Sequence, residues 1–164
     1  MPSRVSALAL SVLVCFSTAG QAQGPDRQVR DPQAALWDAA IAGDTAAMAA
    51  ALRRGADVDS LDTRTNPNGR RALNWAAWYN RVPAIRFLLA HGAHREARNI
   101  TGFTALHHAA EAGSLEAAEA LLAAGADPDA ANNEGRRPAE TALAKGHGVV
   151  AVLLESRSRR DAAR

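Results

Sequence analysis

A short segment that contains a pair of alanines recurs along the chain, and its spacing limits the possible folds more than any other feature. The copies begin near Leu36, Leu73 and Leu106, which lie 37 and 33 residues apart. Nineteen residues after each leucine stands a Gly-Ala pair, at residues 55–56, 92–93 and 125–126. A repeat of this length indicates a stack of similar supersecondary units, in which each unit buries its apolar face against the next.

Each unit carries the residues expected at the ends of two short helices. A residue that tolerates a left-handed backbone follows the first apolar segment of each unit, at Gly43, Asn80, Gly113 and Gly146. Such a residue ends the first helix. We expect Asp44 and Ser114 to cap the second helix of their units, and Pro83 to lie in the first turn of another. Glycines mark the ends of three second helices, at Gly55, Gly92 and Gly125.

Helices of two or three turns are marginal in isolation, so their stability must come from stacking. The aromatic fraction is 4%, which means that the core depends on alanine and leucine. The alanine pairs at residues 76–77 and 109–110 would let the first helices approach closely. A continuous apolar seam between the second helices is predicted at Leu52, Leu88, Leu89, Leu121, Leu122, Leu153 and Leu154.

The third unit shows the pattern most completely. Residues 104–110 read Thr-Ala-Leu-His-His-Ala-Ala, and residues 121–127 read Leu-Leu-Ala-Ala-Gly-Ala-Asp. This resembles the ankyrin-repeat family, whose units of 33 residues carry a T-P-L-H-x-A motif. The resemblance covers roughly residues 34–155 and implies an all-α ankyrin-repeat solenoid of about four helix-turn-helix units. These are expected at residues 34–62, 70–99, 102–132 and 135–155.

The terminal units of such a solenoid act as caps and are often atypical. The fourth unit is partial and carries Ala139 where the other units carry leucine. Residues 23–33 are expected to form a linker before the repeats. Residues 156–164 are expected to form a basic C-terminal tail, exposed to solvent and frayed.

The first two dozen residues differ from the rest and resemble an export signal. Arg4 is followed by an apolar run from Val5 to Phe16, and Gly20 and Ala22 have the spacing of a cleavage site. Residues 1–22 are therefore predicted to be a signal peptide that is cleaved after Ala22, which would place the product in the periplasm or outside the cell. An uncleaved membrane anchor is the alternative. Cleavage would remove the one cysteine of the chain, and with it disulfides, thiol catalysis and cysteine-based zinc binding.

Charge gives no indication of nucleic-acid binding. The chain has 19 Lys plus Arg against 17 Asp plus Glu, and the basic residues are dispersed. Nucleic-acid binding usually requires a clustered basic face. We expect no nucleic-acid partner, and no membrane contact once the signal is removed.

Partner-binding residues follow from the resemblance, because ankyrin repeats present loop tips and the exposed face of the first helix to their partners. Trp, Tyr and Arg often dominate interface energy, which singles out Trp78 and Tyr79 as anchors. The alternative is that these two rings pack over a neighbouring unit. Trp37 and Trp75 are expected in the core. The positions carried over are Arg70, Trp78, Tyr79, Ile100, Thr101, Phe103, Glu111, Ala112, Glu134, Arg136 and Lys145.

The segment that links the first unit to the second is four residues longer than the corresponding segment between the second and third units. It contains residues 63–69. Insertions in solenoids map to loops, often on the binding face. The alternative is a tolerated surface insertion.

Catalysis and cofactor binding have no support in the sequence. The motifs for a nucleophile elbow, a phosphate loop and a His-Glu-x-x-His zinc site are absent. His91 and His94 flank a turn, His107 has the position of a structural histidine in the family, and His108 and Glu111 lack a third ligand. We expect no enzyme, no cofactor and no metal.

The predicted function is the binding of an extracytoplasmic protein through the concave face and the loop tips. A self-associating scaffold, with a homodimer as one form, is the first alternative. A histidine-based metal carrier is the second.

Overall fold

The computed structural model describes residues 31–161 of the chain. Helices account for its regular structure, and the described residues contain no strand beyond one isolated bridge between Asp62 and Arg70. The helices are α1 (Pro32–Ala42), α2 (Thr45–Arg53), α3 (Ala72–Trp78), α4 (Val82–Ala90), α5 (Ala105–Ala112), α6 (Leu115–Ala123), α7 (Pro138–Ala144) and α8 (Gly148–Asp161). The predicted all-α solenoid of four helix pairs is confirmed.

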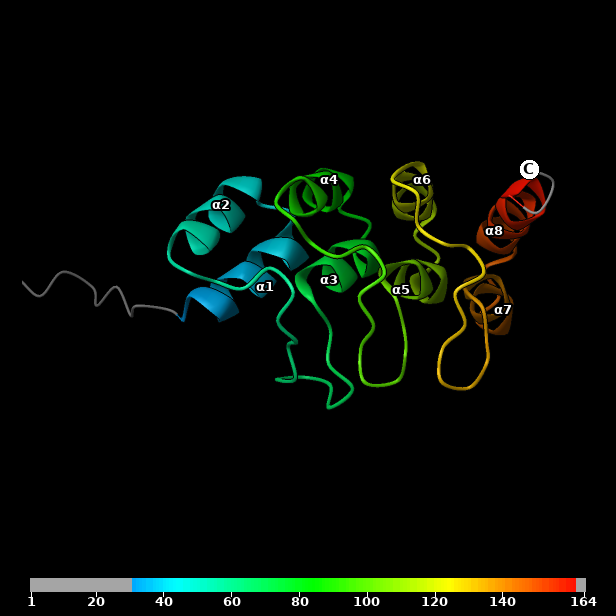
Figure 1. Cartoon of the computed structure of the whole chain (residues 1–164), viewed down its shortest axis with the longest axis horizontal. Helices are drawn as coiled ribbons and strands as arrows, with labels where there is room; N and C mark the ends of the chain where they lie inside the picture. The colour runs from blue at the N-terminus through cyan, green and yellow to red at the C-terminus, as the bar shows by residue number, and fades with distance from the viewer. Residues whose placement is uncertain (1–30, 162–164) are drawn as a thin grey trace, which may run out of the picture.

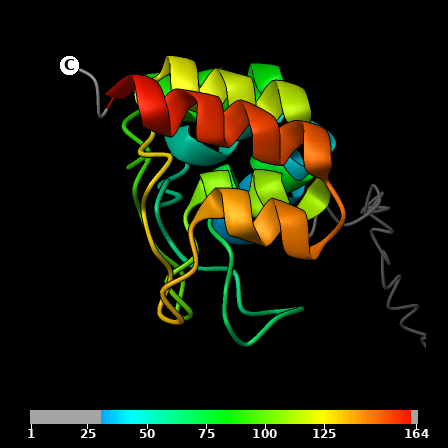
Figure 2. The same ribbon diagram turned by 90° about the vertical axis from the view of Figure 1, so that its right-hand side faces the viewer.

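The helices form two parallel rows. Figure 1 shows α1, α3, α5 and α7 side by side in one row, with α2, α4, α6 and α8 in the other. Figure 2 shows the same two layers from the end of the stack. Loops between units project from the first row on the side away from the second row. None of the described helices has the length and apolar character needed to span a membrane.

The two ends of the solenoid differ from the predicted boundaries. The proposed signal peptide and residues 23–30 of the linker lie outside the described residues. Helix α1 begins at Pro32, within the last residues assigned to the linker. Helix α8 continues to Asp161, so it includes most of the segment that the sequence assigned to a frayed tail.

Helix ends follow the sequence signals in most units. Gly43, Gly113, Gly146 and Asn80 all have positive φ angles, as the turn prediction requires. The Asn80 side chain also accepts a hydrogen bond from the backbone N–H of Ala117 at 2.8 Å, which joins this turn to the next unit.

Asp44 and Ser114 are the N-cap residues of α2 and α6, as predicted, but only Asp44 caps its helix through its side chain. Asp44 accepts a hydrogen bond from the backbone N–H of Ala47 at 2.9 Å. The Ser114 hydroxyl instead donates to the carbonyl oxygen of Trp78 at 2.9 Å. The Ser114 side chain therefore links two units rather than capping its own helix.

A side chain in the first turn caps the start of three first-row helices. Asn74, His107 and Glu140 stand at equivalent positions, 33 residues apart, and each accepts a hydrogen bond from the backbone N–H three residues earlier. His107 also bonds through Nε2 to the carbonyl oxygen of Arg136 at 3.0 Å. Because that carbonyl accepts, Nε2 carries the proton and Nδ1 is the acceptor. The ring thus ties the third unit to the fourth, a structural role that the family resemblance implied.

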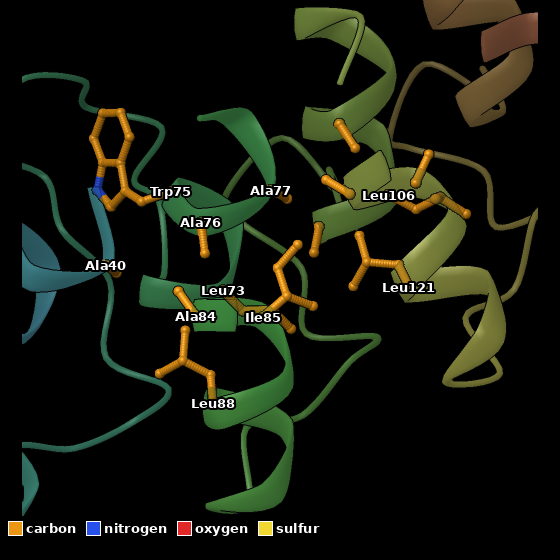
Figure 3. Close-up of a cluster of buried hydrophobic side chains, with 14 of the residues drawn as sticks. Ala40, Leu73, Trp75, Ala76, Ala77, Ala84, Ile85, Leu88, Leu106 and Leu121 are labelled. Carbon is orange, nitrogen blue, oxygen red and sulfur yellow. The ribbon is translucent and has the colours of Figure 1, made fainter. Parts of the chain in front are cut away.

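The core lies between the two rows and repeats with the units. Leu36, Leu73, Leu106 and Ala139 occupy one equivalent position and are all buried. In the second row Leu88, Leu121 and Leu154 are fully buried, while Leu52, Leu89, Leu122 and Leu153 are partly buried and pack against the same cluster. Figure 3 shows Leu73, Ile85 and Leu88 gathered between the helices, with the Trp75 ring directed away from them.

The projecting loops are here called fingers and comprise residues 62–70, 99–103 and 132–136. A backbone N–H to carbonyl bond closes each finger at its base. The first finger encloses residues 63–69 and the others only three residues each, so the insertion lies at the tip of the first finger. Adjacent fingers are joined, because Ile100 N–H donates to Asn68 and Asn133 N–H donates to Thr101.

Candidate partner-binding face

The fingers and the first helix row together form one surface, here called the finger-side face (Figure 1). All of the residues that the resemblance nominated lie on it. Ile100 at a finger tip is 58% exposed and Tyr79 at the end of α3 is 43% exposed. Large apolar side chains exposed to this extent are available for contact with a partner.

Arg70 lies against two tryptophan rings at the base of the first finger. Its guanidinium carbon is 4.6 Å from the ring centroid of Trp75 and 4.3 Å from that of Trp78. A guanidinium at this distance from a ring face gains cation–π attraction. Burial lowers the pKa of Arg70, and its Nε has no hydrogen-bond partner among the described residues. Arg70 is therefore fixed by stacking rather than by an ion pair.

The two rings of the aromatic pair differ in how far they pack against the rest of the chain. The Trp78 ring is half-buried between Arg70 and the edge of His108 in the next unit, so it does pack over its neighbour. Tyr79 stacks on Trp75 with ring centroids 6.1 Å apart and keeps its outer face in solvent. Trp75 and Trp37 are buried, at 6% and 8% exposure, as predicted.

Arg64, from the inserted residues, folds back onto the first unit. It donates to Asp62 at 2.9 Å and to Asp38 of α1 at 2.9 Å, and its guanidinium lies 4.9 Å from the Trp37 ring centroid. Asp62 is 1% exposed and also accepts from the Trp75 indole N–H. Burial opposes the ionisation of Asp62, but the bonds from Arg64 outweigh it and the net effect lowers the Asp62 pKa.

These groups surround an open hollow of about 530 Å³ between the first and second units. It is called the Trp78 hollow here. Its walls come from α1, the first finger and α3, and include Asp38, Asp62, Arg64, Arg70, Trp75, Trp78 and Tyr79. A hollow with aromatic walls and a few fixed charges can take a side chain of a partner protein.

A second charged group continues along α5 and α7. Glu111 pairs with Lys145 at 3.2 Å, and the ring of His108 lies 3.8 Å from the Glu111 carboxylate. The Lys145 ammonium beside it lowers the pKa of the Glu111 carboxyl. The His108 separation is longer than a hydrogen bond, and neither ring nitrogen of this buried histidine has a partner among the described residues. Burial lowers the pKa of His108, so the ring is uncharged at neutral pH.

The remaining nominated residues lie outside the Trp78 hollow, on the second and third fingers and at the end of α5. Phe103 is half-buried against the rings of His107 and His108. The Thr101 hydroxyl donates to Asn99 within its own finger. Arg136 is exposed and pairs with Glu134. Ala112, half-buried, occupies the position equivalent to Tyr79 and Lys145.

The sequence analysis missed the acidic side of the hollow. Asp38, Asp62 and Arg64 were not nominated, although Arg64 lies within the insertion that was singled out. The insertion pointed to the part of the chain that contains Arg64. The partner of Arg64, Asp38, lies 26 positions away in the sequence. Local patterns carry no information about such a pair.

The histidines have individual structural contacts. His91 bonds through Nδ1 to the Phe87 carbonyl oxygen and stacks on that ring. His94 is exposed, and its backbone N–H donates to Asp59. Within residues 31–161, no three side chains of His, Cys, Asp or Glu are grouped in a way that could hold a metal ion.

Comparison with known proteins identifies the repeat. The family model described as "Ankyrin repeats (3 copies)" matches residues 9–99 and again residues 91–162. Protein phosphatase 1 regulatory subunit 27 of Mus musculus is 36% identical over 116 residues, which are 70% of this chain and 73% of that protein. The B-cell lymphoma 3 protein homolog of Mus musculus is 32% identical over 152 residues, 92% of this chain and 32% of that protein.

A third relative covers a similar share of this chain. The ankyrin repeat domain-containing protein SAT10 of Stachybotrys chartarum is 32% identical over 123 residues, 75% of this chain. The chain spans only 6% of SAT10 and about a third of the B-cell lymphoma 3 homolog, so these two relatives are much longer proteins.

Proposed function

Because the chain belongs to the ankyrin-repeat family, we propose that it binds another protein through its finger-side face. Ankyrin repeats generally mediate contacts between proteins and are typically non-enzymatic. One relative is by its name a regulatory subunit of a phosphatase, which is a role that acts through a second polypeptide. The proposed function needs no catalytic group.

The Trp78 hollow is the observation that carries this proposal. It combines stacked aromatic rings, a fixed arginine and the exposed ring of Tyr79. Aromatic and arginine side chains in a concave site are the usual centre of a protein interface. Ile100 and the neighbouring finger tips extend the surface beyond the hollow.

Affinity capture with paired variants tests the choice of face. Tyr79→Ala combined with Ile100→Ala removes two exposed side chains from the finger-side face and should leave the fold intact. Arg86→Ala combined with Glu119→Ala changes two exposed residues of the second row and serves as the control. We expect the first variant to lose the proteins that the unchanged chain captures, and the control to retain them. The reverse result would move the interface to the other row.

We further propose that the partner is extracytoplasmic, on the strength of residues 1–22. Their charge, apolar run and small residues have the pattern of an export signal. N-terminal sequencing of the protein from fractionated cells tests this. A product that starts at Gln23 in the periplasmic or external fraction supports export, and an intact Met1 product in the cytoplasm refutes it.

Self-association is the second candidate, because the last unit exposes apolar side chains. Leu143 is 56% exposed, whereas the equivalent Ala40, Ala77 and Ala110 are covered by the following unit. Val149 and Val152 of α8 are each 70% exposed. Light scattering over a range of concentrations should show a dimer that Leu143→Lys removes if this end mediates pairing. A monomer at all concentrations would exclude it.

A further inference from the structure

We propose that Arg70 is the binding site for the carboxylate of an aspartate or glutamate side chain in the partner protein. The inference rests on the proposed protein-binding function and specifies its chemistry. It assigns to the Trp78 hollow one occupant, an acidic segment of a polypeptide that lies across α3 with its carboxylate directed at Arg70.

Arg70 is held in position before any partner arrives. The backbone of Arg70 exchanges two hydrogen bonds with Asp62, at 2.8 and 3.0 Å, and its guanidinium is stacked on Trp75 and Trp78. Little side-chain freedom remains to be lost on binding. Pre-organisation of this kind favours affinity, since the ordering cost of a long side chain is otherwise considerable.

Arg70 also has unused hydrogen-bonding capacity, unlike the charged groups around it. Arg64 is paired with Asp62 and Asp38, and Lys145 is paired with Glu111. Arg70 forms none of these ion pairs, and its buried Nε has no acceptor within the described part of the chain. A carboxylate can accept two parallel bonds from the terminal nitrogens of a guanidinium. Binding an acid would therefore give an ion-pair partner to the one cation lining the hollow that forms no salt bridge within the described residues.

A cationic side chain is a poorer occupant of the same place. The oxygens of Asp38 and Asp62 already accept bonds from Arg64, and the faces of Trp75 and Trp78 already carry Arg70. An incoming lysine or arginine would meet Arg70 directly and be repelled by it.

A phosphate group is disfavoured by the surrounding acids. It carries about −1.5 to −2 charges at neutral pH and usually needs several cations. Asp38 lines the hollow, and Glu111 is close enough to Arg70 to affect its pKa. A carboxylate carries a single negative charge and needs only the one unpaired arginine.

Tyr79 offers the partner a second contact beside Arg70. Its ring stacks on Trp75 at the rim of the hollow and remains 43% exposed. A partner residue beside the acid would cover this ring with an apolar side chain. The expected recognition element is thus an acidic residue next to an apolar or aromatic one.

Selection of displayed peptides by the full chain tests the inference directly. The probe is a library of random short peptides, followed by synthesis of the best binder and of its copy with the acidic residue changed to Gln or to phosphoserine. We expect selected peptides to be rich in Asp or Glu beside an apolar residue. The change to Gln should weaken binding to the unchanged chain by about 10- to 100-fold, as loss of a charged pair of hydrogen bonds does.

Protein variants then assign the effect to Arg70. In Arg70→Gln the acidic peptide and its Gln copy should bind equally, which is the signature of a coupled pair. Arg86→Gln is the matched control, because Arg86 is an exposed arginine of the second helix row and lies outside the finger-side face. It should keep the preference for the acidic peptide. The peptide change requires no altered protein, so it tests the inference even if Arg70→Gln folds poorly.

The outcomes separate the inference from the proposed function. Selected peptides without an acidic preference, a preference that survives in Arg70→Gln, or tighter binding of the phosphoserine copy would each overturn the carboxylate assignment and leave protein binding in place. A library that yields no peptide bound to the finger-side face would count against the proposed function itself.

Discussion

Acidification from pH 7 to pH 5 should weaken the fold through His107. This ring is fully buried, accepts from the Thr104 backbone N–H and bonds through Nε2 to the Arg136 carbonyl oxygen. Burial lowers its pKa to about 4 and outweighs the bond to the Arg136 carbonyl, which raises it, while the Arg98 charge acts in the same direction as burial. Protonation would place a charge in the core and remove the acceptor that caps α5.

The sign of the effect follows from linkage. The folded chain binds the proton less readily than the unfolded chain, whose histidine has the ordinary pKa of 6.5. The stabilisation is complete above pH 6.5 and is lost as the pH falls toward 4. With these two pKa values, the loss in unfolding free energy between pH 7 and pH 5 is about 2 kcal/mol, and the full effect is about 3 kcal/mol.

His107→Asn provides the matched control, because asparagine occupies the equivalent position in the second unit. Asn74 has the equivalent position in α3 and accepts from the Arg71 backbone N–H at 2.8 Å. The variant should keep the helix cap, lose the bond to Arg136 and no longer titrate at this position. His108 is present in both proteins, so its contribution cancels in the comparison.

Urea unfolding followed by tryptophan fluorescence at pH 7 and pH 5 measures the effect. The unchanged chain should lose about 2 kcal/mol more than His107→Asn between the two pH values. Equal losses in the two proteins would refute the assignment of this pH dependence to His107.

Three further comparisons test the packing by urea unfolding. Leu121→Ala should cost about 3 kcal/mol because the side chain is fully buried, whereas Leu143→Ala should cost less than about 0.5 kcal/mol; equal costs would contradict the assigned core. Asn80→Ala should cost about 1 kcal/mol more unfolding free energy than Asn80→Gly, because both lose the bond to the next unit but only alanine is strained at φ 55. An alanine variant more stable than the glycine variant would contradict this explanation. Gly102→Ala should be worse than Gly92→Ala, because both have positive φ but only the former Cβ meets a neighbouring backbone nitrogen at 2.7 Å; similar costs would show that the fingers adjust freely.

The sequence was sufficient for the architecture because the units repeat. The positions of Leu36, Leu73 and Leu106 share one environment, and the turn residues recur in phase with them. Each local signal was supported by its copies one unit away, which is why helix pairs and turns were predicted correctly. Ser114, whose side chain does not cap its helix, shows the limit of a local signal, since its hydroxyl found an acceptor in the preceding unit.

The candidate site could be predicted only in part. The resemblance nominated Arg70, Trp78 and Tyr79, which line one hollow in the structure, because ankyrin units present the same positions to partners. The Trp78 hollow itself depends on how the inserted residues fold back, with Arg64 bonded to Asp38 in the first unit. No periodic feature encodes that contact, because the insertion occurs in one unit only. The absence of a salt bridge to Arg70 could not be predicted either, because it depends on where every nearby carboxylate lies in the folded chain.

Site-specific photo-crosslinking tests most directly whether a partner contacts the finger-side face. A photoreactive residue would replace Thr65 or Tyr79 at the Trp78 hollow, and Arg86 or Glu119 on the exposed surface of the second row. We expect crosslinks to another protein from the first two positions and none from the last two. Crosslinks from Arg86 and Glu119, with none from Thr65 or Tyr79, would contradict the proposed interface.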